Sequence, residues 1–163
     1  MTERVLIVDD EEDLRYVYTR QLRGDGYLLD TASDGEEAIQ KIKTNEYAVI
    51  LTDMRMPRKD GLAVIAAVRE HLPEAEIIVL TGHGSLENAL QAFKAGNIFE
   101  YLLKPLDDIG MLNTVVARAL ERPARAREQR LAAEHDERLR HVRAEARPAA
   151  PGEQHAERPA AHQ

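Results

Sequence analysis

The sequence predicts an α/β protein built on a doubly wound, five-stranded parallel sheet, followed by a C-terminal extension that is first helical and then disordered. Two observations predict the sheet. Short apolar runs alternate with longer segments whose apolar residues recur every three or four positions, as expected for strands alternating with amphipathic helices. The short apolar runs are typical of strands buried in a parallel sheet. Four of them lead into a polar residue, and the carboxyl ends of parallel strands are where sites form in open α/β sheets. Right-handed crossovers then place helices on both faces of the sheet.

The first two predicted strands flank an amphipathic helix. Arg4–Val8 is an apolar run and predicts the first strand. Glu12–Arg23 carries its apolar residues on one helical face and predicts a helix. The Gly-Asp-Gly sequence at positions 24–26 predicts a turn, after which Tyr27–Thr31 predicts the second strand.

A helix cap and a proline bound the elements in the middle of the domain. Ser33–Glu36 has the composition of a cap and opens a helix that continues to Lys43. Ala48–Thr52 predicts the third strand. After a loop, Leu62–Leu72 predicts a helix that is stopped by Pro73.

Two further strand–helix pairs complete the predicted domain. Glu76–Leu80 predicts the fourth strand, and Ser85 predicts the cap of a helix that runs to Lys94. Phe99–Leu103 predicts the fifth strand, and Asp107–Leu120 predicts the last helix. For the strands we expect the order 2-1-3-4-5, which belongs to the flavodoxin-like class of doubly wound sheets.

The chain changes character after Glu121. Arg122-Pro123 predicts a break or kink in the helix, because proline lacks the amide donor of an interior helical residue. Residues 122–147 are rich in Ala, Arg and Glu, and predict an exposed helix or a weak coiled coil. The composition of residues 148–163 predicts a disordered tail. We therefore expect a domain at residues 1–121, a helical extension at 122–147 and the tail.

Charge and composition exclude several classes of function for the domain. Residues 1–120 carry 21 Asp and Glu against 13 Lys and Arg, an acidic balance that makes direct binding to nucleic acid unfavourable. The longest apolar run, Leu62–Val68, is too short to span a bilayer. The absence of cysteine fits a reducing compartment. We expect a cytoplasmic protein that contacts neither membrane nor nucleic acid directly.

Three carboxylates follow two of the predicted strands. Asp9 and Asp10 come directly after the first strand, and Asp53 comes directly after the third. Because the carboxyl ends of parallel strands meet at one edge of the sheet, we expect these side chains to lie close together. Carboxylates in such proximity repel one another, and a hard divalent cation removes the repulsion. The pattern indicates a site for Mg²⁺, or Mn²⁺ in its place, although an acidic pair after a strand is also a common helix cap.

Asp53 is the candidate nucleophile. A carboxylate is able to accept a phosphoryl group and form an acyl phosphate, provided that a cation or an amine offsets the charge of the donor. Two alternatives stay open for Asp53 at this point: it is only a third metal ligand, or it begins the turn at Met54–Gly61.

Two further predicted strands lead into Thr81 and Lys104. Lys104 is able to direct its ammonium at a phosphoryl group or to pair with Asp53, and the alternative is a solvated lysine. Thr81 can offer a hydroxyl to a phosphoryl oxygen while Gly82 leaves room, and the alternative is an ordinary β-branched strand residue. His83 has no His or Cys partner nearby, which predicts an exposed side chain rather than a metal ligand. Together the four strand ends indicate phosphoryl chemistry.

The combined motifs resemble the receiver domain of two-component response regulators. The resemblance covers about residues 3–121, and its pieces are Asp9-Asp10, Asp53 with Met54-Arg55-Met56-Pro57, Gly61, Thr81 and Lys104-Pro105. It implies that Asp53 takes a phosphoryl group from the phosphohistidine of a histidine kinase. It also implies that Asp10, Asp53 and the backbone carbonyl of Arg55 ligate Mg²⁺, while Asp9 acts mainly through water.

The resemblance implies further roles around the phosphoacceptor. Thr81 and Lys104 would bond the phosphoryl oxygens. Tyr101 matches the switch aromatic that turns inward as Thr81 moves toward the phosphate, although ordinary packing would explain this tyrosine equally well. Arg55 and His83 hold the two positions that tune self-dephosphorylation, and their size favours a long-lived phosphoryl group.

One departure from the family pattern concerns the spacing of the site. Thr81 and Lys104 are 23 positions apart, one more than is usual in the family. The extra residue falls near Ala95–Phe99, where it predicts a longer turn before the fifth strand.

The leading hypothesis is a stand-alone receiver that is not an enzyme and that switches protein–protein interactions. Its expected partners are a histidine kinase or phosphotransfer protein, a downstream protein target and a second copy in a phosphorylation-linked homodimer. One alternative is a receiver-plus-linker fragment of a larger regulator or sensor kinase. The other is a Mg²⁺-dependent phosphatase with Asp53 as covalent nucleophile; such enzymes usually carry a second Asp two positions later, where this chain has Arg55.

Overall fold

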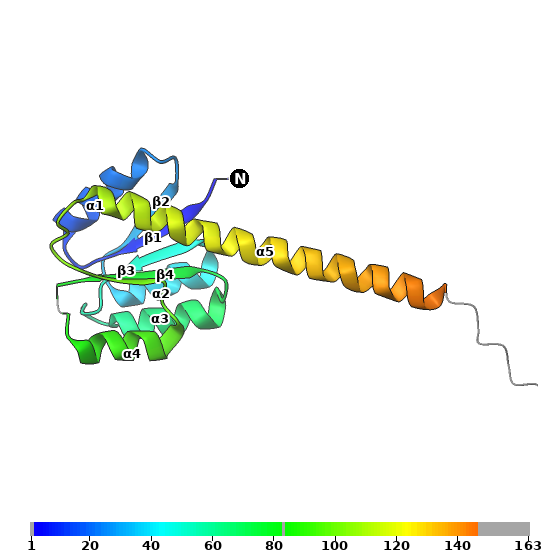
Figure 1. Ribbon diagram of the computed structural model, residues 1–163. Helices are drawn as coiled ribbons and strands as arrows, with labels where there is room; N and C mark the ends of the chain where they lie inside the picture. Colours follow the sequence, from blue (N-terminus) through cyan, green and yellow to red (C-terminus); the bar gives the residue numbers. More distant parts are fainter. Residues whose placement is uncertain (1, 83, 147–163) are drawn as a thin grey trace, which may run out of the picture. The chain divides into compact units, whose positions relative to one another are not determined.

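The structure, a computed structural model, describes residues 2–82 and 84–146 and contains one five-stranded sheet (Figure 1). All the strands are parallel and their order is β2-β1-β3-β4-β5. The predicted fold class and strand order are confirmed. The strands are β1 (Arg4–Val8), β2 (Leu28–Ala32), β3 (Val49–Thr52), β4 (Glu76–Thr81) and β5 (Glu100–Leu103).

Helices cover both faces of the sheet (Figure 1). One face carries α1 and the first turns of α5, and the opposite face carries α2, α3 and α4. This two-sided arrangement is the consequence of right-handed crossovers between parallel strands. The helices are α1 (Glu12–Arg23), α2 (Gly35–Thr44), α3 (Gly61–His71), α4 (Leu86–Gly96) and α5 (Gly110–Glu145).

The three central strands are apolar on both faces, which is why they appear in the sequence as continuous apolar runs. Leu6 and Ile50 point toward the layer of α2, α3 and α4, whereas Val5 and Val49 point toward α1 and α5. All four side chains are completely buried. The core therefore consists of two mainly aliphatic layers, one on each face of the sheet.

Side-chain caps fix the start of three helices. Asp34, Asp60 and Ser85 each accept a hydrogen bond from the backbone N–H three residues later, at distances of 2.8, 3.0 and 3.1 Å respectively. The sequence predicts the first and third of these caps, but not the second. At the other end of α4, the helix runs two residues beyond the predicted Lys94, and the chain turns at Asn97 in the left-handed region with φ of 48°.

The prediction of a break at Pro123 is wrong, because α5 is one continuous helix from Gly110 to Glu145. The proline removes a single backbone donor, and the Ala-, Arg- and Glu-rich residues on either side favour helix strongly. By its internal contacts the chain divides into two units between Ala126 and Arg127, so this helix belongs to both. The predicted disordered tail lies outside the described residues. Of the helices in the described part of the chain, none combines the length and apolar character needed to cross a membrane.

Candidate functional site

The register of the sheet brings the predicted site residues to one edge. Val8 of β1 pairs with Thr52 of β3, so Asp9 and Asp53 leave neighbouring strands at the same level. The backbone ladder continues one residue further, because the Asp53 N–H donates to the Val8 carbonyl at 3.0 Å. In the same way, the Lys104 N–H donates to the Thr81 carbonyl at 2.9 Å. Regular backbone pairing therefore positions the start of each loop that carries a site residue.

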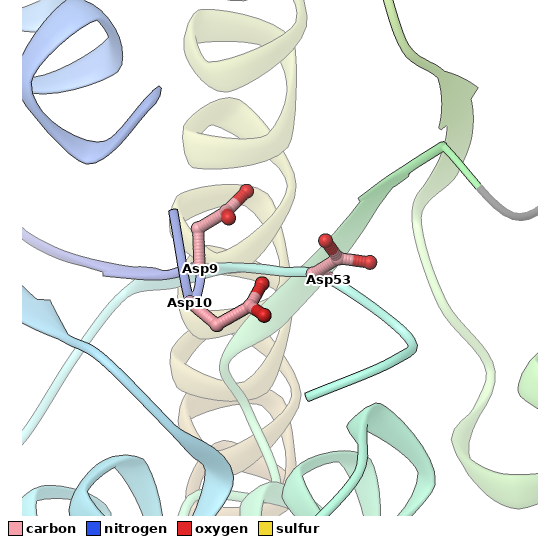
Figure 2. A group of neighbouring side chains, drawn as sticks. All are labelled: Asp9, Asp10 and Asp53. Atoms are coloured by element: carbon pink, nitrogen blue, oxygen red, sulfur yellow. The ribbon is translucent and has the colours of Figure 1, made fainter. Parts of the chain in front are cut away.

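Asp9, Asp10 and Asp53 form an acidic cluster at this edge (Figure 2). One carboxylate oxygen of each lies within 4.8 Å of the others, and no other group of this kind is found in the described residues. Asp9 and Asp53 are buried, with 2% and 5% exposure, whereas Asp10 is exposed. The cluster is therefore open to solvent on the Asp10 side and closed on the side of the sheet.

Lys104 joins the two buried carboxylates. Its ammonium donates to Asp9 Oδ2 at 2.5 Å and to Asp53 Oδ2 at 2.8 Å, and the side chain is only 13% exposed. Burial lowers the pKa of Lys104, but the hydrogen bonds to Asp53 and Asp9 outweigh it, so the pKa lies above its ordinary value of 10.5. Lys104 is therefore charged at neutral pH and is not a solvated lysine.

Backbone amides hold the other oxygen of Asp53. Asp53 Oδ1 accepts from the Met54 N–H at 2.6 Å and from the Arg55 N–H at 3.3 Å. With Oδ2 on Lys104, the carboxylate is bonded on both oxygens and its direction is fixed. A carboxylate fixed in this way needs little reorganisation before it reacts or binds a cation.

Arg15 is a neighbour of the site that the sequence reasoning missed. It lies on α1, and its guanidinium donates to the backbone carbonyl of Asp9 at 2.7 Å. The Asp9 side chain in turn accepts from the Glu11 N–H at 2.9 Å, so the turn after β1 is held from both sides. The spacing of six residues between Asp9 and Arg15 puts the arginine on the first turn of α1, and that spacing is the only signal for it in the sequence.

The remaining predicted residues lie on β4, on β5 and on the loop after β3. Thr81 is completely buried at the end of β4, and Arg55 is exposed on the loop after β3. Tyr101 on β5 packs against the aliphatic layer of α2, α3 and α4, and its buried hydroxyl has no hydrogen-bond partner among the described residues. Burial, and next the charge of Asp53, raises the pKa of Tyr101. His83 lies outside the described residues.

The donor set of the cluster fits a hard divalent cation. Three carboxylates share the site with one ammonium, so two negative charges stay uncompensated. All the ligand atoms are oxygens, which Mg²⁺ and Mn²⁺ prefer, and Mg²⁺ needs only one or two carboxylates besides water and phosphate oxygens. The residues present are therefore able to hold such an ion.

Comparison with known proteins gives one consistent family. The sequence matches the response regulator receiver domain over residues 5–116. It is 38% identical to the DNA-binding transcriptional regulator NtrC of Klebsiella pneumoniae over 101 residues, which is 62% of this chain and 21% of NtrC. It is 36% identical to the transcriptional regulatory protein SrrA of Staphylococcus aureus over 105 residues, which is 64% of this chain and 43% of SrrA. The match therefore spans about a fifth of NtrC and less than half of SrrA.

Solved structures with the same fold agree with this assignment. A CheY-like response regulator receiver domain from Methanospirillum hungatei superposes with a TM-score of 0.74 at 25% identity, covering 77% of this chain and 99% of that one. The solution structure of the beryllofluoride-activated NtrC4 receiver domain dimer gives 0.68 at 38% identity, covering 74% and 98%. The matched region includes the acidic cluster and Lys104. This chain belongs to the response regulator receiver domain family, whose members act in two-component phosphorelay signalling.

Proposed function

We propose that Asp53 accepts a phosphoryl group from the phosphohistidine of a histidine kinase or phosphotransfer protein. The observation that carries the proposal is the fixed Asp53 carboxylate, which is buried at 5% exposure and bonded to Lys104 at 2.8 Å beside two further carboxylates. Asp9 and Asp10 lie next to each other on one side of Asp53 (Figure 2), where they would supply oxygen ligands rather than a second acceptor.

The transfer forms one bond and breaks one. An oxygen of the Asp53 carboxylate attacks phosphorus, and the bond between phosphorus and the histidine nitrogen breaks. The histidine ring leaves with the electron pair of that bond and takes up a proton. The Lys104 ammonium, which is charged and bonded to Asp53, would then donate to one phosphoryl oxygen, and the Thr81 hydroxyl would donate to another.

A divalent cation completes the charge balance of this site. Asp10, Asp53 and the backbone carbonyl of Arg55 would hold Mg²⁺ or Mn²⁺ directly, and Asp9 would act through water. When bound, the ion offsets the negative charge of the phosphoryl oxygens. The two uncompensated charges of the cluster support this assignment.

The acyl phosphate then changes the surface of the domain. Thr81 lies on β4, which pairs with β5, the strand of Tyr101, so a shift of Thr81 toward the phosphoryl group changes the packing available to Tyr101. The unpartnered Tyr101 hydroxyl supports a side chain with more than one arrangement. Arg55 and His83 slow hydrolysis by obstructing water, and the exposure of Arg55 beside Asp53 supports its part in this.

The output of the switch is a change of protein contacts in the cytoplasm. The partners are the phosphodonor protein, a downstream protein and a second copy of the chain, and the protein phosphorylates itself from small donors without being a phosphatase. The NtrC4 receiver, a structural relative, is a dimer in its beryllofluoride-activated form, which supports the homodimer. The acidic balance of residues 1–120 argues against direct contact of this domain with nucleic acid.

Intact-mass measurement tests the proposal. We expect the wild-type chain, incubated with Mg²⁺ and acetyl phosphate, to gain the mass of one phosphoryl group, and Asp53→Asn to gain none. Asp60→Asn is the matched control, because Asp60 lies in the same loop as Asp53 and asparagine caps a helix as well as aspartate does. Equal labelling of Asp53→Asn and wild type, or continuous release of phosphate without a labelled protein, would contradict the proposal.

A further inference from the structure

The loop between β3 and α3 carries the phosphoacceptor, and it is supported from outside the site. The loop begins at Asp53 and ends at Gly61. Its two ends lie side by side, because the Gly61 N–H donates to the Met54 carbonyl at 2.9 Å. A Cβ atom at Gly61 would lie 2.4 Å from the Asp53 carbonyl. Between these ends the Lys59 N–H donates to the Pro57 carbonyl at 2.9 Å, and residues 57–60 are exposed.

Gly35, the first residue of α2, lies against this part of the loop. A Cβ atom at Gly35 would lie 2.1 Å from the backbone carbonyl oxygen of Lys59 and 2.6 Å from its carbonyl carbon. These are backbone atoms, which cannot move aside as the end of a flexible side chain would. The φ of Gly35 is not in the left-handed region, so close approach and not backbone conformation requires the glycine.

Asp34 ties the same loop from the neighbouring position. Its Oδ1 caps α2, and its Oδ2 pairs with the Arg58 guanidinium at 3.4 Å. Arg58 has a φ of 70°, a left-handed conformation that a non-glycine residue keeps only where its surroundings impose it. The Arg58 side chain is 69% exposed, so burial of its side chain does not impose this conformation.

From these contacts we infer that Asp34 and Gly35 are positioning residues for the phosphoacceptor loop. They hold the backbone of Arg58 and Lys59, and through it the conformation in which the loop presents Asp53 and the Arg55 carbonyl to the divalent cation. Neither residue touches the phosphoryl group. The inference rests on the proposed function. It adds that two residues at the start of α2 set the affinity of the site for the divalent cation.

Mg²⁺ affinity of the full chain measures this support directly. We expect Gly35→Ala to raise the Kd for Mg²⁺ about tenfold, as loss of support around a metal ligand typically does. The Kd is measured without phosphodonor from the backbone amide resonances of residues 54–56 and 58–61, since Pro57 has none. Gly24→Ala is the matched control, because nothing lies within 4 Å of a Cβ atom at Gly24. A Gly35→Ala chain that unfolds cooperatively in urea and binds Mg²⁺ as tightly as Gly24→Ala would overturn the inference.

A second pair of variants decides the matter if Gly35→Ala does not fold. Arg58→Gly and Arg58→Val both lose the ion pair with Asp34, and both replace an exposed side chain. Glycine adopts a φ of 70° freely, whereas a β-branched residue resists it. We expect Arg58→Gly, which loses only the ion pair with Asp34, to raise the Kd slightly, and Arg58→Val, which also resists the φ of 70°, to raise it several-fold. Equal affinities for the two variants would overturn the inference.

Different results would refute the phosphoacceptor role of Asp53 and the support of its loop by α2. If wild type binds Mg²⁺ but gains no phosphoryl group from acetyl phosphate, the proposed function fails while the affinity comparison still reports on the loop. If wild type is labelled on Asp53, but Gly35→Ala binds Mg²⁺ as tightly as Gly24→Ala and Arg58→Val as tightly as Arg58→Gly, the function stands and the support from α2 is refuted.

Discussion

A single ammonium lies between two buried carboxylates that come from different strands. Lys104 contacts Asp9 at 2.5 Å and Asp53 at 2.8 Å. Its charge therefore offsets part of the repulsion within the acidic cluster in the absence of a divalent cation. A divalent cation bound at the cluster would offset the negative charge of the same carboxylates, in addition to the charge of Lys104.

Replacing the lysine tests this division of charge. We expect Lys104→Met to lower the free energy of unfolding by about 3 kcal/mol without Mg²⁺, because two buried carboxylates lose their counter-ion. Addition of Mg²⁺ should then stabilise the variant more than wild type. Urea unfolding with and without Mg²⁺ measures both effects, and Lys43→Met, at an exposed position on α2, is the control. An unchanged unfolding curve for Lys104→Met would show that the pairing contributes no stability.

The sequence was sufficient to predict which residues gather at the site, but not how they contact one another. Asp9, Asp10, Asp53 and Lys104 follow apolar runs, and parallel topology brings such positions together. That Lys104 bonds Asp9 as well as Asp53 depends on side-chain geometry that no periodicity encodes. Arg15 and Gly35 were missed for a related reason, since each acts through a backbone carbonyl of another segment.

The start of α2 shows how local chemistry positions a whole element. Glu37 accepts from the backbone N–H of Ser33 at 2.9 Å and from the Ser33 hydroxyl at 2.8 Å. The backbone bond is the main cause that lowers the pKa of Glu37 below its ordinary value of 4.5. Because the folded-state pKa is the lower one, this carboxylate stabilises the fold above pH 4.5, and the stabilisation is lost as the pH falls through the folded-state value.

Glu37→Gln should accordingly have a pH-dependent effect. We expect the variant to unfold at lower urea concentration than wild type at neutral pH, and the difference to shrink as the pH falls through the lowered pKa of Glu37, because the wild-type carboxyl is then protonated too. Glu36→Gln removes an equal charge from the same turn of α2 without the bonds to Ser33, and should show a smaller difference. A Glu37→Gln effect that persists unchanged at the acid end would contradict the assigned role of the ionised carboxylate.

Element positions follow from the sequence to within one or two residues, except at α5. Caps and apolar periodicity determine where α2 and α4 begin, and both begin where Asp34 and Ser85 predict. The rule that proline ends a helix failed at Pro123, since the residues around it favour helix and only one backbone bond is lost. The effect of one proline on a helix is outweighed when the residues on both sides of it favour helix.

The receiver carries its whole core and its site before the boundary at Ala126. The α5 residues that pack on the sheet end at Leu120, and the described side chains at positions 131–146 are exposed. The change of composition predicts a boundary after Glu121, whereas the internal contacts divide the chain between Ala126 and Arg127, within α5. The fold is therefore specified by the alternation of strands and helices in the first part of the chain.

Truncation tests the independence of the receiver. We expect a chain that ends at Ala126 to keep the melting temperature of the full chain and the same rate of labelling by acetyl phosphate, because no core residue is removed. Differential scanning calorimetry and intact mass measure the two properties. A clear fall in either would mean that residues 127–163 support the receiver.

The most direct test of the central claim is to identify the phosphorylated side chain itself. Labelled protein is treated with borohydride, which reduces an acyl phosphate to a primary alcohol, and peptide masses then locate the reduced residue. We predict that the side chain at position 53 alone becomes that of homoserine, and only when Mg²⁺ was present during labelling. Reduction at Asp9 or Asp10, or phosphate on a residue other than aspartate, would contradict it.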